Sequence, residues 1–357
     1  MKRFLFIPMV TLLTIFSSCN SQNGSNNERT NSGSVEADST NSGIVREQTA
    51  MPKDSTLLIM ALPPTLDCLP FYAAKHFGIY DSLGLNLELH TCYSDIDCDT
   101  LLTSGTADII YSDIVRAINM RSKNAPVKAV ASTSLNLNLL SASKSGISKT
   151  SELNEKVFAV TRHSAIDFLT DKILEANSLA PKSLNKPQIN DLKIRTQMFN
   201  RNQFDGTVLP QPYAAYSQCL GAHNIDNSDK YNINLSALLS NDSVITCRRE
   251  DITKLIKAYD IAASRLNQMY STDGTGKDKA TADVKDMLHI LPTGIQYPDT
   301  MRLDAKFPQS SNISLITFKS ALKWFEDQRL VPKSQSRSLG IEYTEIIDTS
   351  FCNDAKK

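Results

Sequence analysis

The class of fold is decided by residues 56–89, TLLIMALPPTLDCLPFYAAKHFGIYDSLGLNLEL. Residues 56–62 are almost wholly apolar and end at two prolines, which predicts a strand buried on both faces. Apolar side chains then recur on one helical stripe as far as Tyr80, with Gly78 near its end. Leucines alternate with polar residues over 85–89, as in a second strand. This succession predicts a βαβ unit, which implies a parallel sheet.

The same order continues along the chain and then begins again. Residue 62, the end of the first strand, lies 46 residues before Asp108, and Val160 lies 45 residues before Asp205. Two similar α/β lobes, each with a mainly parallel sheet flanked by helices, are the simplest account, and they leave a cleft between them. Further strands are expected over residues 108–111, 127–131, 157–160, 192–196 and 205–209.

The last third of the chain is predicted to be mostly helical, with apolar stripes over residues 252–262, 284–291 and 315–325. Residues 135–142 and 235–247 have the character of connections between lobes. We therefore expect lobe 1 to comprise residues 55–135 and 245–357, including the C-terminal helices, and lobe 2 to comprise residues 136–244.

The N-terminal segment predicts export. Two basic residues precede an apolar run over residues 4–16, which is too short to span a bilayer and is typical of a signal peptide, residues 1–18. Ser17, Ser18 and Cys19 at its end resemble the lipobox of bacterial lipoproteins, although Phe16 stands where leucine is commonest. The resemblance implies a lipidated Cys19 in the cell envelope, facing the periplasm; simple secretion is the alternative. Residues 19–54 then form a polar, disordered tether.

Composition excludes several classes of function. The 38 basic and 38 acidic residues balance and form no long block, so no nucleic-acid partner is expected. The five histidines have no metal-ligand spacing, and residues 274–277 match a phosphate loop only in part, because Asp278 stands where serine or threonine is required. We expect no catalytic residue, metal or cofactor. Cys92 and Cys98 are close enough in sequence to form a disulfide in an exported chain.

Several motifs, in order, resemble the substrate-binding proteins of ABC importers of the sulfonate, nitrate and thiamine-precursor type. They are LPFYAAKHFGIY at 69–80, GLNLEL at 84–89, LTSGTAD at 102–108 and LPQPY at 209–213. The resemblance covers residues 55–221 and implies a type II periplasmic-binding fold, whose two hinged lobes close on a ligand. It also implies an ABC-importer permease as partner, and we expect a monomer. Gln211 departs from the pattern, which has glutamate at that position.

Candidate ligand-binding residues follow from the fold. In open α/β sheets, ligands lie beyond the carboxyl ends of the strands. Asp113 and Ser164 fit helix capping as well as ligand binding, and Phe71 fits a core position as well as a stacking wall. The candidates are Thr65, Asp67, Phe71, Ser112, Asp113, Ser132 and Thr133 from lobe 1, and His163, Ser164, Gln211 and Tyr213 from lobe 2.

These features favour a lipid-anchored solute-binding protein that captures a small polar or heteroaromatic molecule. Two alternatives are an enzyme of pyrimidine or menaquinone metabolism on the same fold, and an accessory lipoprotein that binds another protein. The charge of the ligand stays open. Asp67 and Asp113 favour a cationic or donor-rich ligand, whereas Arg162, His163 and two helix N-termini favour an anion.

The anchor can be tested directly. Wild-type protein should incorporate labelled palmitate and partition into a detergent phase, because several acyl chains give an effectively permanent anchor. Cys19→Ala should abolish both properties. Labelling that persists in Cys19→Ala would exclude lipidation at this cysteine.

Overall fold

The computed structural model describes residues 56–270, 287–301, 303, 305–328 and 339–356. The predicted signal peptide, Cys19, the tether and residues 274–278 lie outside the described residues. Within the described part of the chain, no helix is both long and apolar enough to cross a bilayer.

The first sheet has the strand order β2-β1-β3-β9-β4. Strand β1 pairs in parallel with β2 and β3, which confirms the predicted βαβ unit, while β9 runs antiparallel to both β3 and β4. The strands are β1 (Leu58–Leu62), β2 (Leu87–Thr91), β3 (Ile109–Asp113), β4 (Val127–Ala131) and β9 (Ser236–Asn241). We call this sheet and the helices on it lobe 1.

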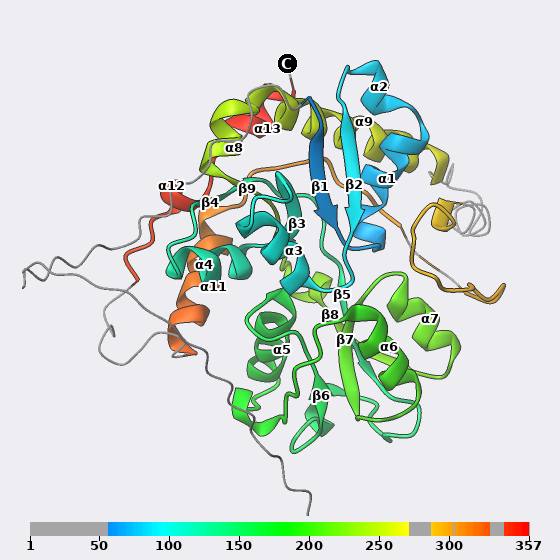
Figure 1. Ribbon diagram of the computed structural model, residues 1–357. Helices are drawn as coiled ribbons and strands as arrows, with labels where there is room; N and C mark the ends of the chain where they lie inside the picture. Colours follow the sequence, from blue (N-terminus) through cyan, green and yellow to red (C-terminus); the bar gives the residue numbers. More distant parts are fainter. Residues whose placement is uncertain (1–55, 271–286, 302, 304, 329–338, 357) are drawn as a thin grey trace, which may run out of the picture. The chain divides into compact units, whose positions relative to one another are not determined.

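The second sheet has the order β6-β7-β5-β8 and forms lobe 2 together with its helices. Only β6 and β7 are parallel, because β5 runs antiparallel to β7 and β8. The strands are β5 (Leu137–Ser141), β6 (Phe158–Ala159), β7 (Gly206–Pro210) and β8 (His223–Asn227). The fold class is thus the predicted α/β arrangement of two sheets flanked by helices (Figure 1).

Both sheets are mixed rather than mainly parallel, and the reason is how the chain passes between them. A strand that follows a crossover helix starts at the same edge as its predecessor and runs parallel to it. Strands β5 and β9 instead enter directly from the other sheet, so they start where the neighbouring strands end. Leu137 accordingly pairs with Pro210, and Ser236 pairs with Asp113.

Two details of the predicted organisation are wrong. The segments expected as connections contain β5 and β9, the latter followed by α8 (Asp242–Cys247), so the chain rejoins the first sheet at Ser236 and not at residue 245. The strand expected over residues 192–196 is helix α6 (Leu192–Asn200). Its buried residues recur at helical spacing, whereas Ile194, part of the apparent alternation, is 51% exposed.

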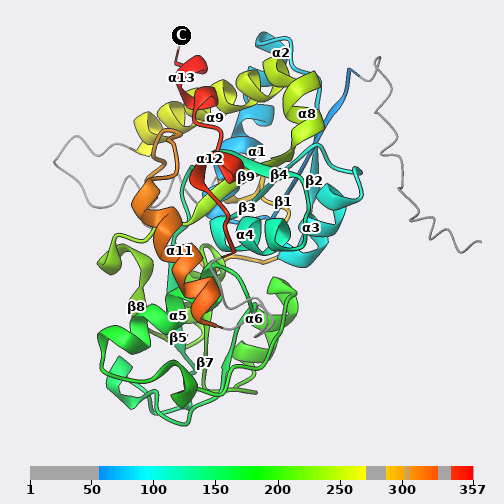
Figure 2. The ribbon, with the colours of Figure 1, turned by 90° about the vertical axis from the view of Figure 1, so that its left-hand side faces the viewer.

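Helices cover both faces of the first sheet (Figures 1 and 2). Helices α1, α2 and α9 pack on the face that carries Leu58 and Met60, and α3, α4 and α11 pack on the face that carries Ala61 and Ile110. Strand β1 is therefore buried on both faces, as predicted. The bounds are α1 (Leu69–His76), α2 (Ile79–Ser82), α3 (Asp95–Thr103), α4 (Ile114–Ser122), α9 (Arg249–Tyr270) and α11 (Leu315–Asp327).

Lobe 2 carries α5 (Ala165–Ala176), α6 and α7 (Tyr213–Cys219), and the chain ends with α12 (Tyr343–Ile346) and α13 (Ser350–Asp354). Helix α11 runs along α4 of lobe 1 and reaches α5 of lobe 2, where the Trp324 ring meets that of Phe168 edge-on at 5.6 Å (Figure 2). Short 3-10 turns are η1 (Leu66–Cys68), η2 (Thr150–Glu152), η3 (Pro181–Ser183) and η4 (Ser228–Tyr231).

The disulfide expected between Cys92 and Cys98 is not formed. Both thiols are free and buried in the apolar layer between the first sheet and α3. A hydrogen bond from Cys98 lowers the pKa of Cys92, and the same contact raises the pKa of Cys98. The two side chains therefore pack against each other as reduced core residues.

One glycine in the second sheet has no room for a side chain. A Cβ at Gly206 would lie 2.2 Å from the Phe158 ring and 2.6 Å from the backbone oxygen of Leu140. Gly206→Ala should therefore lower the free energy of unfolding by about 3 kcal/mol, the upper end of the usual cost of overpacking, because a buried ring and a backbone atom would both have to move; urea denaturation measures the loss. The control is Gly105→Ala, which meets no neighbour and costs only about 1 kcal/mol for its left-handed backbone. Equal losses in the two variants would contradict this account.

Candidate functional site

Two cavities lie at the carboxyl ends of the strands, between the lobes. The larger has a volume of about 720 Å³ and receives residues from both lobes and from the segments that join them. Its lining consists of Leu66, Asp67, Ser134, Leu135, Asn136, Asn138, Gln211, Gln218, Asn224, Asn227, Asp229, Ile233, Asn234 and residues 305–308. This lining is dominated by amides, and hydrogen bonds fix the orientation of several of them.

A chain of side-chain amides forms the lobe 2 wall of the larger cavity. Asn224 Nδ2 donates to Asn138 Oδ1 (3.0 Å), and Asn138 Nδ2 donates to Asn136 Oδ1 (2.9 Å). Asn136 Nδ2 in turn donates to Asp229 Oδ2 (2.8 Å). Each link holds its neighbour in place, so the wall presents preorganised amide donors and acceptors, with the carboxylate of Asp229 at one end.

Asp67 is the buried acid of the larger cavity. Its Oδ1 accepts hydrogen bonds from Ser134 Oγ (3.0 Å) and from the Asn136 backbone N–H (3.1 Å). Its Oδ2 is buried and has no hydrogen-bond partner among the described residues. Burial raises the pKa of Asp67 to about 7, against the lowering effect of those two hydrogen bonds. Asp67 can therefore offer a ligand one free carboxyl oxygen.

The smaller cavity, of about 50 Å³, adjoins the larger one at Leu135, which lines both. It lies where β1, β3 and β7 end and where α5 and α6 begin. Its polar lining residues are Thr65, Tyr93, Asp95, Tyr111, Ser112, Asp113, Asn190 and Arg195. Of the predicted candidates, it thus brings together Thr65, Ser112 and Asp113.

Asp113 joins the two lobes at this smaller cavity. Its Oδ1 accepts from the Arg116 backbone N–H (2.9 Å) and caps α4, as the sequence predicted. Its Oδ2 accepts from the Ala165 backbone N–H (2.9 Å), at the first residue of α5 in lobe 2. One buried carboxylate therefore occupies two helix N-termini at once, and burial raises its pKa to about 7.

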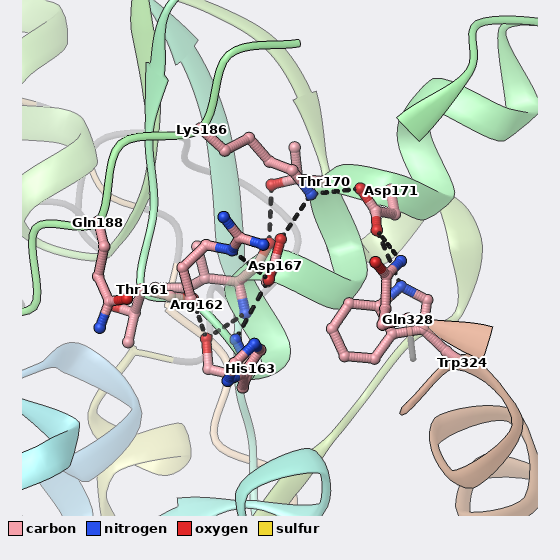
Figure 3. Close-up of polar contacts among 12 residues, drawn as sticks. Thr161, Arg162, His163, Asp167, Thr170, Asp171, Lys186, Gln188, Trp324 and Gln328 are labelled. Atoms are coloured by element: carbon pink, nitrogen blue, oxygen red, sulfur yellow. Dashed lines mark hydrogen bonds and ion pairs between the residues drawn. The ribbon is translucent and has the colours of Figure 1, made fainter. Parts of the chain in front are cut away.

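A polar network behind the cavities ties α5 to α11 (Figure 3). Lys186 Nζ lies 2.6 Å from Asp167 Oδ1 and 2.6 Å from Asp171 Oδ1, and both carboxylates are buried. Asp171 Oδ2 also accepts hydrogen bonds from Trp324 Nε1 (3.0 Å) and Gln328 Nε2 (2.7 Å). Helix α11 is thereby fixed to lobe 2 by buried, charge-assisted hydrogen bonds.

A family model described as NMT1/THI5-like matches residues 65–267, more than half of the chain. The chain belongs to the NMT1/THI5-like family. The matched part runs from the start of η1 almost to the end of α9, and so contains both sheets except β1, together with most of the residues that line the two cavities. Among curated proteins, none matches the chain significantly in sequence.

Solved structures of binding proteins share the fold of this NMT1/THI5-like chain. The ligand-binding component of an ABC-type import system from Staphylococcus aureus, with zinc bound, superposes with a TM-score of 0.65 at 14% identity, over 84% of this chain and 98% of that one. The nitrate-binding protein NrtA from Synechocystis superposes with a TM-score of 0.64 at 13% identity, over 85% of this chain and 88% of that one. The alkanesulfonate-binding protein SsuA from Xanthomonas axonopodis, bound to MOPS, superposes with a TM-score of 0.62 at 16% identity, over 78% of this chain and 95% of that one. The predicted periplasmic-binding fold is confirmed.

The remaining candidates line neither cavity. Ser132 and Thr133 bind Ser236 where the chain passes between the lobes: the Ser132 and Ser236 hydroxyls are 2.9 Å apart, and the Thr133 N–H donates to Ser236 Oγ (3.0 Å). Phe71 is fully buried, with its ring 4.8 Å from that of Tyr259. These three residues therefore pack behind the cavities and do not line them.

In lobe 2 the other candidates surround the start of α5 and of α7. Ser164 Oγ accepts from the Ile166 N–H and so caps α5. His163 has a left-handed backbone (φ 57°), its N–H donates to Asp167 Oδ2 (3.2 Å), and burial lowers its pKa (Figure 3). Tyr213 is buried in the core of lobe 2. Their role as ligand contacts stays a prediction.

Gln211 lines the larger cavity, but it also has a structural role that the sequence did not reveal. Its Oε1 accepts from the Ala215 N–H (3.0 Å), in the first turn of α7. Its backbone oxygen accepts from the Leu66 N–H (2.7 Å), which links the lobes. A single cleft lined by both Asp113 and Gln211, which were predicted to bind ligand from opposite lobes, is therefore wrong: Asp113 lines the smaller cavity and Gln211 the larger.

Arg195 and the asparagines were missed by sequence reasoning. The alternation over residues 192–196 predicted a strand there, and this prediction gave no reason to expect Arg195 in the site. In helix α6, Arg195 falls on the buried stripe with Leu192 and Phe199. The signal that identifies the helix is Asp191, whose Oδ1 accepts from the Ile194 N–H (2.7 Å) as an N-cap.

Both buried acids should make stability depend on pH. Each pKa rises from 3.8 to about 7 on folding, so the folded protein binds these protons more tightly than the unfolded chain. Their contribution to stability is fully present below about pH 3.8 and is lost as the pH rises through about 7. Asp67→Asn and Asp113→Asn should each remove it, gaining up to about 4 kcal/mol relative to wild type between pH 4 and pH 8.

Urea denaturation over this pH range measures the effect. Asparagine keeps the one oxygen that accepts both hydrogen bonds of Asp67. At residue 113 its oxygen can still cap α4, but its amide nitrogen cannot accept the Ala165 N–H, so Asp113→Asn should also lose a pH-independent amount of stability. The exposed Asp81→Asn is the control and should show no such trend. A difference from wild type that stays constant with pH in both buried variants would contradict the account.

Proposed function

We propose that this protein is an exported, lipid-anchored solute-binding protein, which holds a small polar or heteroaromatic molecule in the larger cavity and delivers it to an ABC importer. The observation that supports this best is the larger cavity itself. Its volume of about 720 Å³ falls within the roughly 300–1,000 Å³ of small-molecule sites, and both lobes line it.

The chemistry of the lining favours a ligand with many hydrogen-bonding groups. Asn138, Asn224 and Gln218 supply amides, and Asp67 supplies a buried carboxyl oxygen without a partner. A ligand that satisfies such groups gains affinity and selectivity together, because an analogue that leaves them unpaired meets their full desolvation cost. A donor on the ligand, such as a ring or exocyclic N–H, would complement Asp67 Oδ2.

Capture follows from the position of the cavity. A ligand that touches both lobes stabilises their closed arrangement relative to an open one, since opening removes half of its contacts. Among the described residues, neither cavity is lined by a histidine or a cysteine, which favours binding over acid–base or nucleophilic catalysis.

Delivery and anchoring rest on different support. Binding components of ABC-type import systems share the fold, which favours a permease as partner. The anchor rests on Cys19 after its apolar segment, followed by a polar tether long enough to hold the lobes away from a membrane surface.

The ligand should be recoverable from the protein itself. Mass spectrometry of small molecules released from gently purified wild-type protein should find one species in a near-stoichiometric amount. Asp67→Ala and Asn224→Ala should each reduce its occupancy at least tenfold, because each removes a polar contact of the larger cavity. The control is the exposed Asn86→Ala, which should retain it.

The purified ligand, added back to stripped protein, should raise the melting temperature. It should also reduce the radius of gyration measured by X-ray scattering, because closure draws the lobes together. Unchanged occupancy in both cavity variants would refute the larger cavity as the binding site.

A further inference from the structure

The smaller cavity contains a buried cation that lacks a carboxylate partner. Arg195 is only 2% exposed, and its Nη1 donates to two neutral acceptors, Thr161 Oγ1 (2.7 Å) and the Ile189 backbone oxygen (2.6 Å). Its Nε is buried and has no hydrogen-bond partner, and none of the described residues forms an ion pair with it. Guanidinium carries five N–H donors, and a buried charge without a counter-charge costs several kcal/mol.

A second unsatisfied group faces the same space from the other lobe. Ser112 is 6% exposed, and its Oγ is buried with no partner among the described residues. The cavity between Ser112 and Arg195 measures about 50 Å³, and one water needs only about 10–15 Å³. It therefore has room for a small ion and a few waters.

The nearby acids do not neutralise Arg195 by direct contact. Both oxygens of Asp113 already accept backbone N–H groups. Asp95, in the first turn of α3, lines the cavity and is half-buried. Burial lowers the pKa of Arg195 to about 10, against the opposing charges of Asp95 and Asp191. Arg195 thus stays cationic at neutral pH while losing much of its hydration.

We propose that Arg195 and Ser112 bind a small monovalent anion, of the size of chloride, in the smaller cavity. The anion would accept the Arg195 Nε–H and the Ser112 O–H, and so satisfy both orphaned donors. Because the two residues belong to opposite lobes, the site is complete only when the lobes are together. The anion therefore favours the closed arrangement and should tighten solute binding in the neighbouring cavity.

Chloride is the probe, and the solute is not needed. Stripped protein is prepared in sodium gluconate, whose anion is too large for the cavity, and chloride replaces gluconate at constant ionic strength. The melting temperature of wild type should rise and saturate with chloride. In chloride-35 NMR, the protein should broaden the chloride line, and added bromide should reverse the broadening by displacing chloride. Arg195→Met should lose both responses, and it should fold, because an apolar chain replaces a buried charge.

Three further variants make the test specific. Arg201→Met removes an exposed arginine just beyond the same helix and should behave like wild type. Ser112→Ala should weaken chloride binding at least fivefold, and Asp95→Asn should strengthen it severalfold, because it removes a negative charge from the lining. These readouts do not involve the solute, so they succeed or fail independently of the proposed function.

The proposal is overturned if the melting temperature of wild type does not depend on the chloride-to-gluconate ratio and no line broadening occurs. The cavity would then hold only water. It is equally overturned if Arg195→Met and Ser112→Ala both retain the wild-type chloride response, since that response would be a general salt effect.

Discussion

One buried carboxylate, Asp113, determines how the two halves of the site meet. Its oxygens accept backbone N–H groups from α4 in lobe 1 and from α5 in lobe 2, each at 2.9 Å. A helix N-terminus carries partial positive charge and unsatisfied donors, so an acceptor shared between two of them is favoured in spite of its burial. The contact brings the end of β3 and the start of α5 together, and the smaller cavity lies beside it.

The larger cavity lies beside two further contacts that link the lobes. The Leu66 N–H donates to the Gln211 backbone oxygen, and the Ser132 and Ser236 hydroxyls meet where the chain crosses. Between these contacts, short polar side chains cannot fill the space that aromatic or long aliphatic ones would occupy. The result is a chamber whose polar walls are mostly amides, with the carboxyl groups of Asp67 and Asp229 and the cation of Lys306, suited to a ligand that replaces water by hydrogen bonds.

Helix α11 forms a second connection between the lobes, away from Asp113. Helix α11 packs on α4, and its end is fixed to α5 through Trp324 and Asp171 (Figure 3). Lys186 lies between Asp167 and Asp171 and offsets the repulsion of these two carboxylates, which are one helical turn apart. Movement of the lobes therefore has to be accommodated at α11 as well as at the two crossings, and this limits the directions in which the cleft can open.

The sequence by itself determined the local features. Apolar runs and helical stripes predicted β1, β3, β4 and most helices, and capping chemistry identified Asp113 and Ser164, because these depend on neighbours within a few residues. The family resemblance came from the same local motifs. Tertiary structure alone decided the direction of β5 and β9, the separation of Asp113 and Gln211 into two cavities, and the isolation of Arg195. Each of these depends on partners from 34 to 145 residues away, such as Thr161 for Arg195 and Leu66 for Gln211, and the periodicity of a single segment carries no information about partners at that distance.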